Sequence, residues 1–208
     1  MARTKEFDPA VALDAAMRLF WRNGYARTST EDLVKELGIA RASLYGTFGS
    51  KRVLYLAALD RYLSGGAGDA PEVVSERAKS GFDAVRALLE SAAALPGQGM
   101  PPGCFSVNAT VEHGDGDADV VDKLERNRQR MERVFGSALK RARAEGDLAA
   151  GVDVDRTATL LATVLNGLQV LSRAGADQLP RIAETIDAMM SMLGAHGGAA
   201  QRSREPAR

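Results

Sequence analysis

Hydrophobic residues recur at three- and four-residue intervals along most of the chain, with polar residues between them, and this spacing predicts helices. The first apolar stripe consists of Leu13, Ala16, Met17 and Phe20. An Asp cap followed by Pro at the first helical position, as in Asp8–Pro9, is typical of a helix start. Gly24 follows where the stripe ends, and glycine favours a helix end. The first helix is therefore expected between Pro9 and Gly24.

The same periodicity predicts helices along the rest of the chain and no strand. Their expected ranges are about 30–37, 41–48, 51–63, 71–95, a short helix beginning near Cys104, 119–145, 155–174 and 180–193. Residues 64–71 and 96–103 are rich in Gly and Pro, and they separate the helix expected at 71–95 from the helices before and after it. The predicted fold class is all-α, with about nine helices.

Residues 28–51, TSTEDLVKELGIARASLYGTFGSK, carry the most informative pattern. Ser29 and Asp32 have the spacing of a capping box, and Gly38 stands where a helix end needs a left-handed residue. Two short helices joined by a tight turn, followed by Lys51 at the start of a third, are typical of a helix-turn-helix. That motif places its second helix in the major groove of DNA.

The second helix of this motif has an outer face with little bulk. Leu44 and Phe48 share one side, while Ala42 and Gly46 point the opposite way at about 100° per residue. A slim face lets the helix backbone approach the groove floor, where flanking side chains reach phosphates or base edges. The candidate DNA-contacting residues are Thr28, Ser29, Arg41, Ala42, Ser43, Tyr45, Gly46, Thr47 and Lys51.

These motifs resemble the TetR/AcrR-like (tetracycline-repressor) family. The resemblance rests on LDAAMRLFWRNGYARTS at 13–29, the DLVKELGI turn, and SLYGTFGSK at 43–51. It covers about the first 64 residues, and the remainder only in size and helical character. It implies an N-terminal three-helix domain before a helical ligand-binding and dimerisation domain. The activity it implies is that of a homodimeric transcription factor, usually a repressor that a small molecule releases from its operator.

One departure from the family pattern is Ala40, where the family usually has Ser. The recognition helix therefore lacks a side-chain cap at its start, and a hydroxyl contact with phosphate is not expected there.

The expected domain organisation follows the charge and composition of the chain. Residues 1–64 form the DNA-binding domain with a linking helix, 65–194 the effector-binding and dimerisation domain, and 195–208 a disordered tail. Lys and Arg balance Asp and Glu overall, but residues 1–64 hold ten basic and seven acidic side chains. Because this basic excess is small, binding is expected to depend on two placed half-site contacts in a dimer.

The helices at 155–174 and 180–193 are apolar on broad faces, so they are expected to pair with their copies in a second subunit. The alternative is that both stripes fill the core of one subunit. The predicted interface residues are Leu161, Val164, Leu168, Leu171, Ile182, Ile186, Met189, Met190 and Leu193. A dimer with two recognition helices about one DNA turn apart requires a roughly palindromic operator.

Polar residues within apolar helices are candidates for an effector pocket. They are Cys104, Asn108, Glu112, Asn127, Arg128, Asn166 and Gln169. Cys104 follows Pro-Pro-Gly at an expected helix start, where the helix dipole favours thiolate, so a redox- or electrophile-responsive repressor is one alternative. A small buried hydrophobe is the other interpretation of this cysteine.

Other functions fit the sequence less well. Residues 112–119 are rich in acids, but Val120 and Arg126 stand where a calcium loop requires Gly and Glu. No catalytic or nucleotide-binding motif is present, so no enzyme, metal or cofactor is expected. A single cysteine and the lack of a long apolar run favour a cytoplasmic, non-membrane protein. A helical ligand-binding protein that does not bind DNA remains the second alternative.

Overall fold

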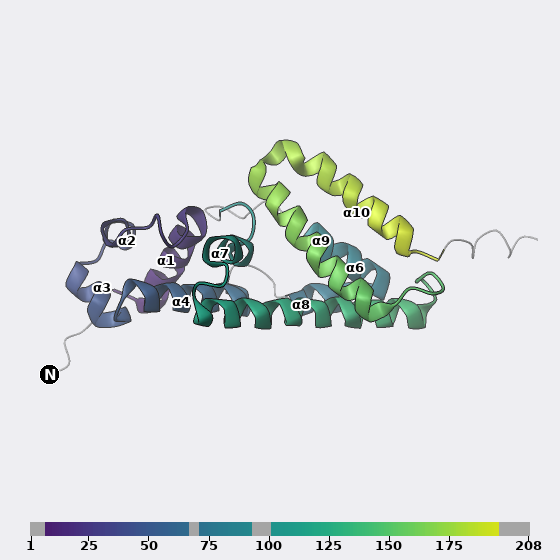
Figure 1. The fold of residues 1–208 in the computed structure, drawn as a ribbon, viewed down its shortest axis with the longest axis horizontal. Helices are drawn as coiled ribbons and strands as arrows, with labels where there is room; N and C mark the ends of the chain where they lie inside the picture. Colours follow the sequence, from purple (N-terminus) through teal and green to yellow (C-terminus); the bar gives the residue numbers. More distant parts are fainter. Residues whose placement is uncertain (1–6, 67–70, 93–100, 196–208) are drawn as a thin grey trace, which may run out of the picture. The chain divides into compact units, whose positions relative to one another are not determined.

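The computed structural model describes residues 7–66, 71–92 and 101–195, and its regular elements there are all helical (Figure 1). The chain divides into two compact units. Unit 1 comprises residues 1–70 and 95–128, and unit 2 comprises residues 71–94 and 129–208. The predicted all-α fold class is confirmed. The expected tail lies outside the described residues, apart from Ala195 at its start.

Unit 1 contains the helix-turn-helix and two helical segments from later in the chain. Its helices are α1 (Pro9–Asn23), α2 (Thr30–Leu37), α3 (Arg41–Phe48), α4 (Lys51–Arg61), a further turn (Tyr62–Gly66), α7 (Phe105–His113) and the first part of α8 (Ala118–Glu145). Its core is made by Met17, Phe20, Leu33, Leu44, Leu54, Tyr55, Leu59, Phe105 and Val120. The apolar face of each short helix is thus buried, and each fully buried Leu or Phe contributes about 1.5–3 kcal/mol.

Local signals fix the ends of the helices in unit 1. The Asp8 carboxylate accepts a hydrogen bond from the Ala10 backbone N–H at 2.8 Å. Ser29 and Asp32 form the predicted capping box, and Gly38 ends α2 in the left-handed conformation, at φ 64°. Ala40 begins α3 without a side-chain cap, as its methyl group requires.

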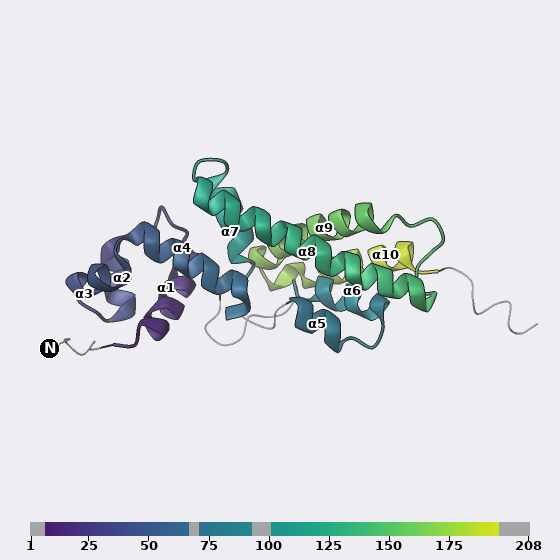
Figure 2. The ribbon, with the colours of Figure 1, turned by 90° about the horizontal axis from the view of Figure 1, so that it is seen from below.

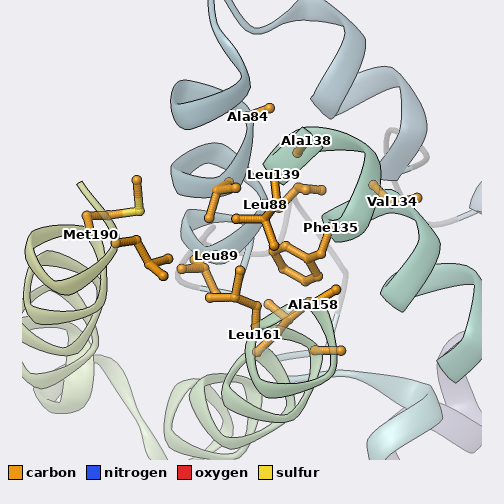
Figure 3. Close-up of a cluster of buried hydrophobic side chains, with 14 of the residues drawn as sticks. Ala84, Leu88, Leu89, Val134, Phe135, Ala138, Leu139, Ala158, Leu161 and Met190 are labelled. Atoms are coloured by element: carbon orange, nitrogen blue, oxygen red, sulfur yellow. The ribbon is translucent and has the colours of Figure 1, made fainter. Parts of the chain in front are cut away.

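Unit 2 packs its helices around a second core. It holds α5 (Pro71–Arg77), α6 (Gly81–Glu90), the rest of α8, α9 (Val154–Ala174), a short turn (Ala176–Gln178) and α10 (Leu179–Leu193) (Figure 2). Leu88 and Leu89 of α6 meet Phe135 and Leu139 of α8, Leu161 of α9 and Met190 of α10 (Figure 3). Backbone bonds from Ala149 N to Leu193 O and from Ala195 N to Asp147 O tie the end of α10 to the α8–α9 turn.

The single helix expected at 71–95 is wrong, because the chain breaks between α5 and α6. The Ser80 hydroxyl caps α6 by accepting from the Asp83 N–H. The Glu145 carboxylate accepts from the Gly81 N–H at 2.6 Å. An ideal Cβ on Gly81 would stand 2.2 Å from Ala142 N, so α6 begins against the backbone of α8. This tertiary contact has no signature in the local periodicity.

The start of α8 also differs from the sequence expectation. It begins at Ala118, one residue before the expected start, and the Asp117 carboxylate accepts hydrogen bonds from the backbone N–H groups of Asp119 and Val120. Among the described residues, no helix is long and apolar enough to cross a membrane.

Candidate nucleic-acid interface

The outer face of α3 has the small profile that its sequence predicts. Leu44 is buried and Phe48 is half-buried against the core of unit 1, whereas Ala42 and Gly46 are exposed. A Cβ built on Gly46 would meet no atom within 4 Å. The space over this face is therefore open to a flat or grooved partner.

Tyr45 and Arg41 flank this face, and both are held by α2. The Tyr45 hydroxyl lies 2.9 Å from Thr30 Oγ1 at the start of α2. The Arg41 guanidinium donates to Glu31 Oε1 at 3.1 Å and lies 5.8 Å from the centre of the Tyr45 ring. Ser43 and Thr47 are half-buried on the same helix. The structure thus brings together the predicted hydroxyl groups of α3 beside one cation.

Lys51 adds a second cation at the start of α4. Its ammonium Nζ lies 4.3 Å from the centre of the Tyr25 ring, within the range of a cation–π interaction. Ser50 caps α4 by accepting from the Val53 N–H at 3.1 Å. The positive end of the α4 dipole and the Lys51 charge therefore coincide, an arrangement that favours an anion.

Ser29 and Thr28 differ in their access to solvent. Ser29 is exposed, and its hydroxyl donates to Asp32 Oδ2 at 2.7 Å, which together with backbone hydrogen bonding lowers the pKa of Asp32. Thr28 is fully buried and donates to the Gly24 carbonyl at 2.6 Å. The prediction that the Thr28 side chain contacts DNA is wrong, because this threonine supports the turn from inside.

Three of the predicted effector residues lie on one face of α7, yet each contacts other parts of unit 1. Asn108 donates to the Trp21 carbonyl at 3.2 Å. Glu112 accepts from the backbone N–H groups of Tyr25 and Ala26 at 2.8 and 2.7 Å. This face therefore joins α7 to the end of α1 and to the segment between α1 and α2.

Cys104 is buried at the N-cap of α7. Its Sγ lies 3.2 Å from the Tyr62 hydroxyl and 2.9 Å from Ser106 Oγ. Burial, with the nearby Cys104 as a second cause, raises the pKa of Tyr62 well above its ordinary value. The thiol is thus partnered and largely shielded, at 5% exposure.

The remaining effector candidates are dispersed. The Arg128 guanidinium pairs with Glu125 on the exposed side of α8, and Asn166 lies on the exposed face of α9. Asn127 and Gln169 are half-buried on α8 and α9. Within their own units, neither Arg128 nor Asn166 is buried.

The predicted dimer residues lie mostly inside unit 2. Its core contains Leu161, Leu168, Ile182, Ile186, Met190 and Leu193, and Val164, Leu171 and Met189 pack against that core. These six side chains therefore belong to the core of unit 2. Leu160, Val170 and Met192 are instead 50%, 53% and 70% exposed. Among the described residues of α9 and α10, these three are the most exposed large apolar side chains.

A cluster of aromatic rings in unit 1 was not anticipated from the sequence. Tyr55 lies at its centre, 5.1 Å from Phe20, 5.7 Å from Phe105 and 5.1 Å from His113 between ring centres. Such pairs contribute about 0.5–1.5 kcal/mol each beyond their burial. The rings come from α1, α4 and α7, so only their separate helical faces were visible in the sequence.

Two family models match successive parts of the chain. Residues 12–58 match the family model described as "Bacterial regulatory proteins, tetR family". Residues 81–189 match "Tetracyclin repressor-like, C-terminal domain".

Similar proteins span nearly the whole chain. An uncharacterized HTH-type transcriptional regulator of Bacillus subtilis, YezE, is 35% identical over 93% of this chain and 100% of its own length. The HTH-type transcriptional repressor ComR of Escherichia coli is 32% identical over 88% and 89%. A cysteine mutant of the TetR family regulator CifR, complexed with 26-bp double-strand operator DNA, superposes with a TM-score of 0.79 at 33% identity. That match covers 92% of this chain and 100% of the other.

Proposed function

The chain belongs to the tetR family of bacterial regulatory proteins, and we propose that it acts as a homodimeric, sequence-specific repressor on double-stranded DNA. The observation that carries this proposal is the open, slim outer face of α3 beside Arg41 and Lys51. Two such faces in a dimer require a roughly palindromic operator. The related CifR structures, which contain operator DNA, support this mode of binding.

Each residue of the interface has a proposed role. The backbone at Ala42 and Gly46 approaches the groove floor. Ser43, Tyr45 and Thr47 reach phosphates or base edges on either side, with Ser29 and Arg41 at the margin. Lys51 neutralises a phosphate at the start of α4, where the helix dipole adds to its charge.

We assign DNA binding to residues 1–64 and effector binding and dimerisation to residues 65–194. Within unit 1, α7 of the second segment contacts the first segment through Asn108 and Glu112. Arg52 and Asp60 of α4 also bond to Asp117, Asp119 and Lys123, so α7 and the start of α8 both connect the second segment to the first.

The proposed dimer surface is the outward side of α9 and α10. It carries Leu160, Val170 and Met192 among small or polar neighbours that include Asn166 and Gly167. Exposed apolar side chains on both helices favour burial against a second copy.

The salt dependence of DNA binding tests the proposal. A duplex is first selected from a random library with the wild-type protein, and its affinity is measured from 50 to 200 mM salt. For about six neutralised phosphates the affinity falls on the order of a thousandfold. Lys51→Met lowers the slope of log affinity against log salt by about one per half-site. Lys79→Met, an exposed lysine of unit 2, is the control. A flat response, or no selected duplex at all, contradicts the proposal and favours a ligand-binding protein without DNA binding.

The effector is proposed to be a small molecule bound by the second segment. A redox- or electrophile-responsive repressor is the alternative, favoured by the position of Cys104 at the start of α7. An electrophile that releases the wild-type protein from DNA then fails to release Cys104→Ser. If the variant is released equally well, the thiol is structural.

A DNA-binding repressor needs no catalytic group, and we propose that this protein is not an enzyme. Its proposed partner is chromosomal DNA in a bacterium, so its proposed location is the cytoplasm.

A further inference from the structure

Glu112 makes the most specific contact between α7 and the segment that leads into the helix-turn-helix. Its two carboxylate oxygens accept separate hydrogen bonds from consecutive backbone N–H groups, those of Tyr25 and Ala26, at 2.8 and 2.7 Å. Bonds from N–H groups to an ionised carboxylate are stronger than neutral ones. Because both bonds are to the backbone, the carboxylate fixes the path of the chain at Tyr25.

The Tyr25 ring lies between α7 and Lys51. On one side the Lys51 ammonium lies 4.3 Å from the ring centre. The His113 and Tyr55 rings lie 5.6 and 4.9 Å from the Tyr25 ring. Tyr25 thus contacts groups of α4 and α7 at once, and a shift of its backbone would move the surface that supports the Lys51 ammonium.

We infer that Glu112 is a positioning residue for DNA binding, which acts through Tyr25 to hold the Lys51 ammonium where it meets a phosphate. This inference rests on the proposed function of Lys51. Through these contacts the position of α7 affects the position of the Lys51 ammonium, so any movement of α7 that withdraws the Glu112 carboxylate weakens operator binding.

The direction in which DNA affinity changes when the Glu112 carboxylate is removed distinguishes a positioning role from an effect of net charge. Removing a carboxylate from a protein that binds a polyanion strengthens binding when only the net charge matters. Loss of the Glu112 carboxylate is expected to do the opposite. The matched control is Asp115→Ala, which removes the same charge from an exposed position three residues further on.

The experiment compares wild type, Glu112→Ala, Glu112→Gln and Asp115→Ala on the selected duplex over a range of salt. Glu112→Ala is expected to weaken binding and to lower the salt slope by up to about one per half-site, as Lys51→Met does. Glu112→Gln keeps one acceptor oxygen and is expected to fall between wild type and Glu112→Ala. Asp115→Ala is expected to keep the wild-type slope and to bind equally or more tightly.

A double-mutant cycle separates positioning from general support of the fold. If Glu112 acts through Lys51, the effects of Glu112→Ala and Lys51→Met on affinity are not additive, because Lys51→Met removes the same ammonium that Glu112→Ala displaces. Additive effects, or an unchanged salt slope in Glu112→Ala, overturn the inference. If Glu112→Ala does not fold, the same cycle is made with Glu112→Gln.

Failure of the inference and failure of the proposed function give different results. If Lys51→Met leaves affinity and slope unchanged, the proposed phosphate contact is wrong. If Lys51→Met weakens binding while both Glu112 variants match wild type, only the positioning role is wrong.

Discussion

The Glu112 carboxylate occupies the space into which a side chain at Gly24 would project. An ideal Cβ on Gly24 would stand 2.8 Å from Glu112 Oε2 and 3.0 Å from Oε1. Gly24 also has φ 83° and ψ 170°, a conformation that side chains rarely adopt. Glycine is thus required at this position for two reasons. The end of α1 needs a positive φ there, and the Glu112 carboxylate of α7 leaves no room for a side chain.

Gly24→Ala is therefore expected to lower the free energy of unfolding by about 1–3 kcal/mol. Thermal or urea unfolding measures this loss. Gly114→Ala is the control, because Gly114 also has a positive φ, of 53°, but meets nothing within 4 Å. The excess loss at Gly24 is the cost of the clash with Glu112, and it should shrink when Glu112→Ala is added. Equal losses at the two glycines would contradict this account.

Gly46→Ala is expected to separate stability from DNA binding. Gly46 lies within α3 with open space around it, so alanine should raise the free energy of unfolding by up to about 1 kcal/mol. The added methyl group lies on the face proposed to approach the groove, so affinity for the selected duplex should fall. Unfolding and duplex titration measure the two effects. A variant that is both more stable and equally tight would contradict the proposed docking of α3.

Gly81→Ala is expected to disrupt unit 2. Its Cβ would stand 2.2 Å from Ala142 N and 2.5 Å from Ala138 O, both of them backbone atoms that cannot move aside cheaply. The expected loss is about 3 kcal/mol, at the upper end for overpacking. Circular dichroism on heating measures it. Gly146→Ala is an internal comparison, because that position has φ 84° but no neighbour within 4 Å. A loss no larger at Gly81 than at Gly146 would show that α6 moves away from α8.

Substitutions on the outer side of α9 and α10 are expected to change the oligomeric state without unfolding the chain. Met192→Asp places a charge on a side chain that is 70% exposed, so a monomer should appear in light scattering while the helical signal is kept. Met190→Asp, two residues away but 3% exposed, should unfold unit 2 instead. A Met192→Asp protein that stays dimeric would place the interface elsewhere.

The Glu72–Arg130 pair is expected to make stability depend on pH. The two side chains share hydrogen bonds of 2.6 and 2.5 Å, and this contact lowers the pKa of Glu72 below its ordinary value of 4.5. A lowered folded-state pKa gives stability that is present above 4.5 and is lost as pH falls through the folded value. Glu72→Gln should therefore be less stable than wild type at pH 7, with the gap closing in acid. A gap independent of pH would contradict this role.

The parts of the fold that sequence predicted are those decided within a few residues. The capping box of Ser29 and Asp32, the left-handed Gly38 and the absence of a cap at Ala40 all depend on neighbouring side chains. The outward direction of Ala42 and Gly46 follows from helical geometry once Leu44 is buried. These local rules were sufficient to recognise a helix-turn-helix.

The parts that sequence missed depend on contacts distant in the chain. Because α9 is apolar on several sides, its pattern did not decide which side faces the core: Leu161 was predicted at the dimer surface but is buried, whereas its neighbour Leu160 is exposed. Glu112 lies 87 positions after Tyr25, so no spacing indicated their hydrogen bond. The sequence around Gly81 does not distinguish it from an ordinary helical residue, because its close contact with the backbone of α8 appears only in the structure.

The contact between the Lys51 ammonium and the Tyr25 ring also affects the entropy cost of binding nucleic acid. A lysine side chain carries about 2 kcal/mol of rotamer entropy, which is lost when it is immobilised on a ligand. With its ammonium already resting on the Tyr25 ring, part of that loss is incurred during folding. The Lys51 side chain is therefore preorganised, so fewer of its rotamers have to be sampled before its ammonium meets a phosphate.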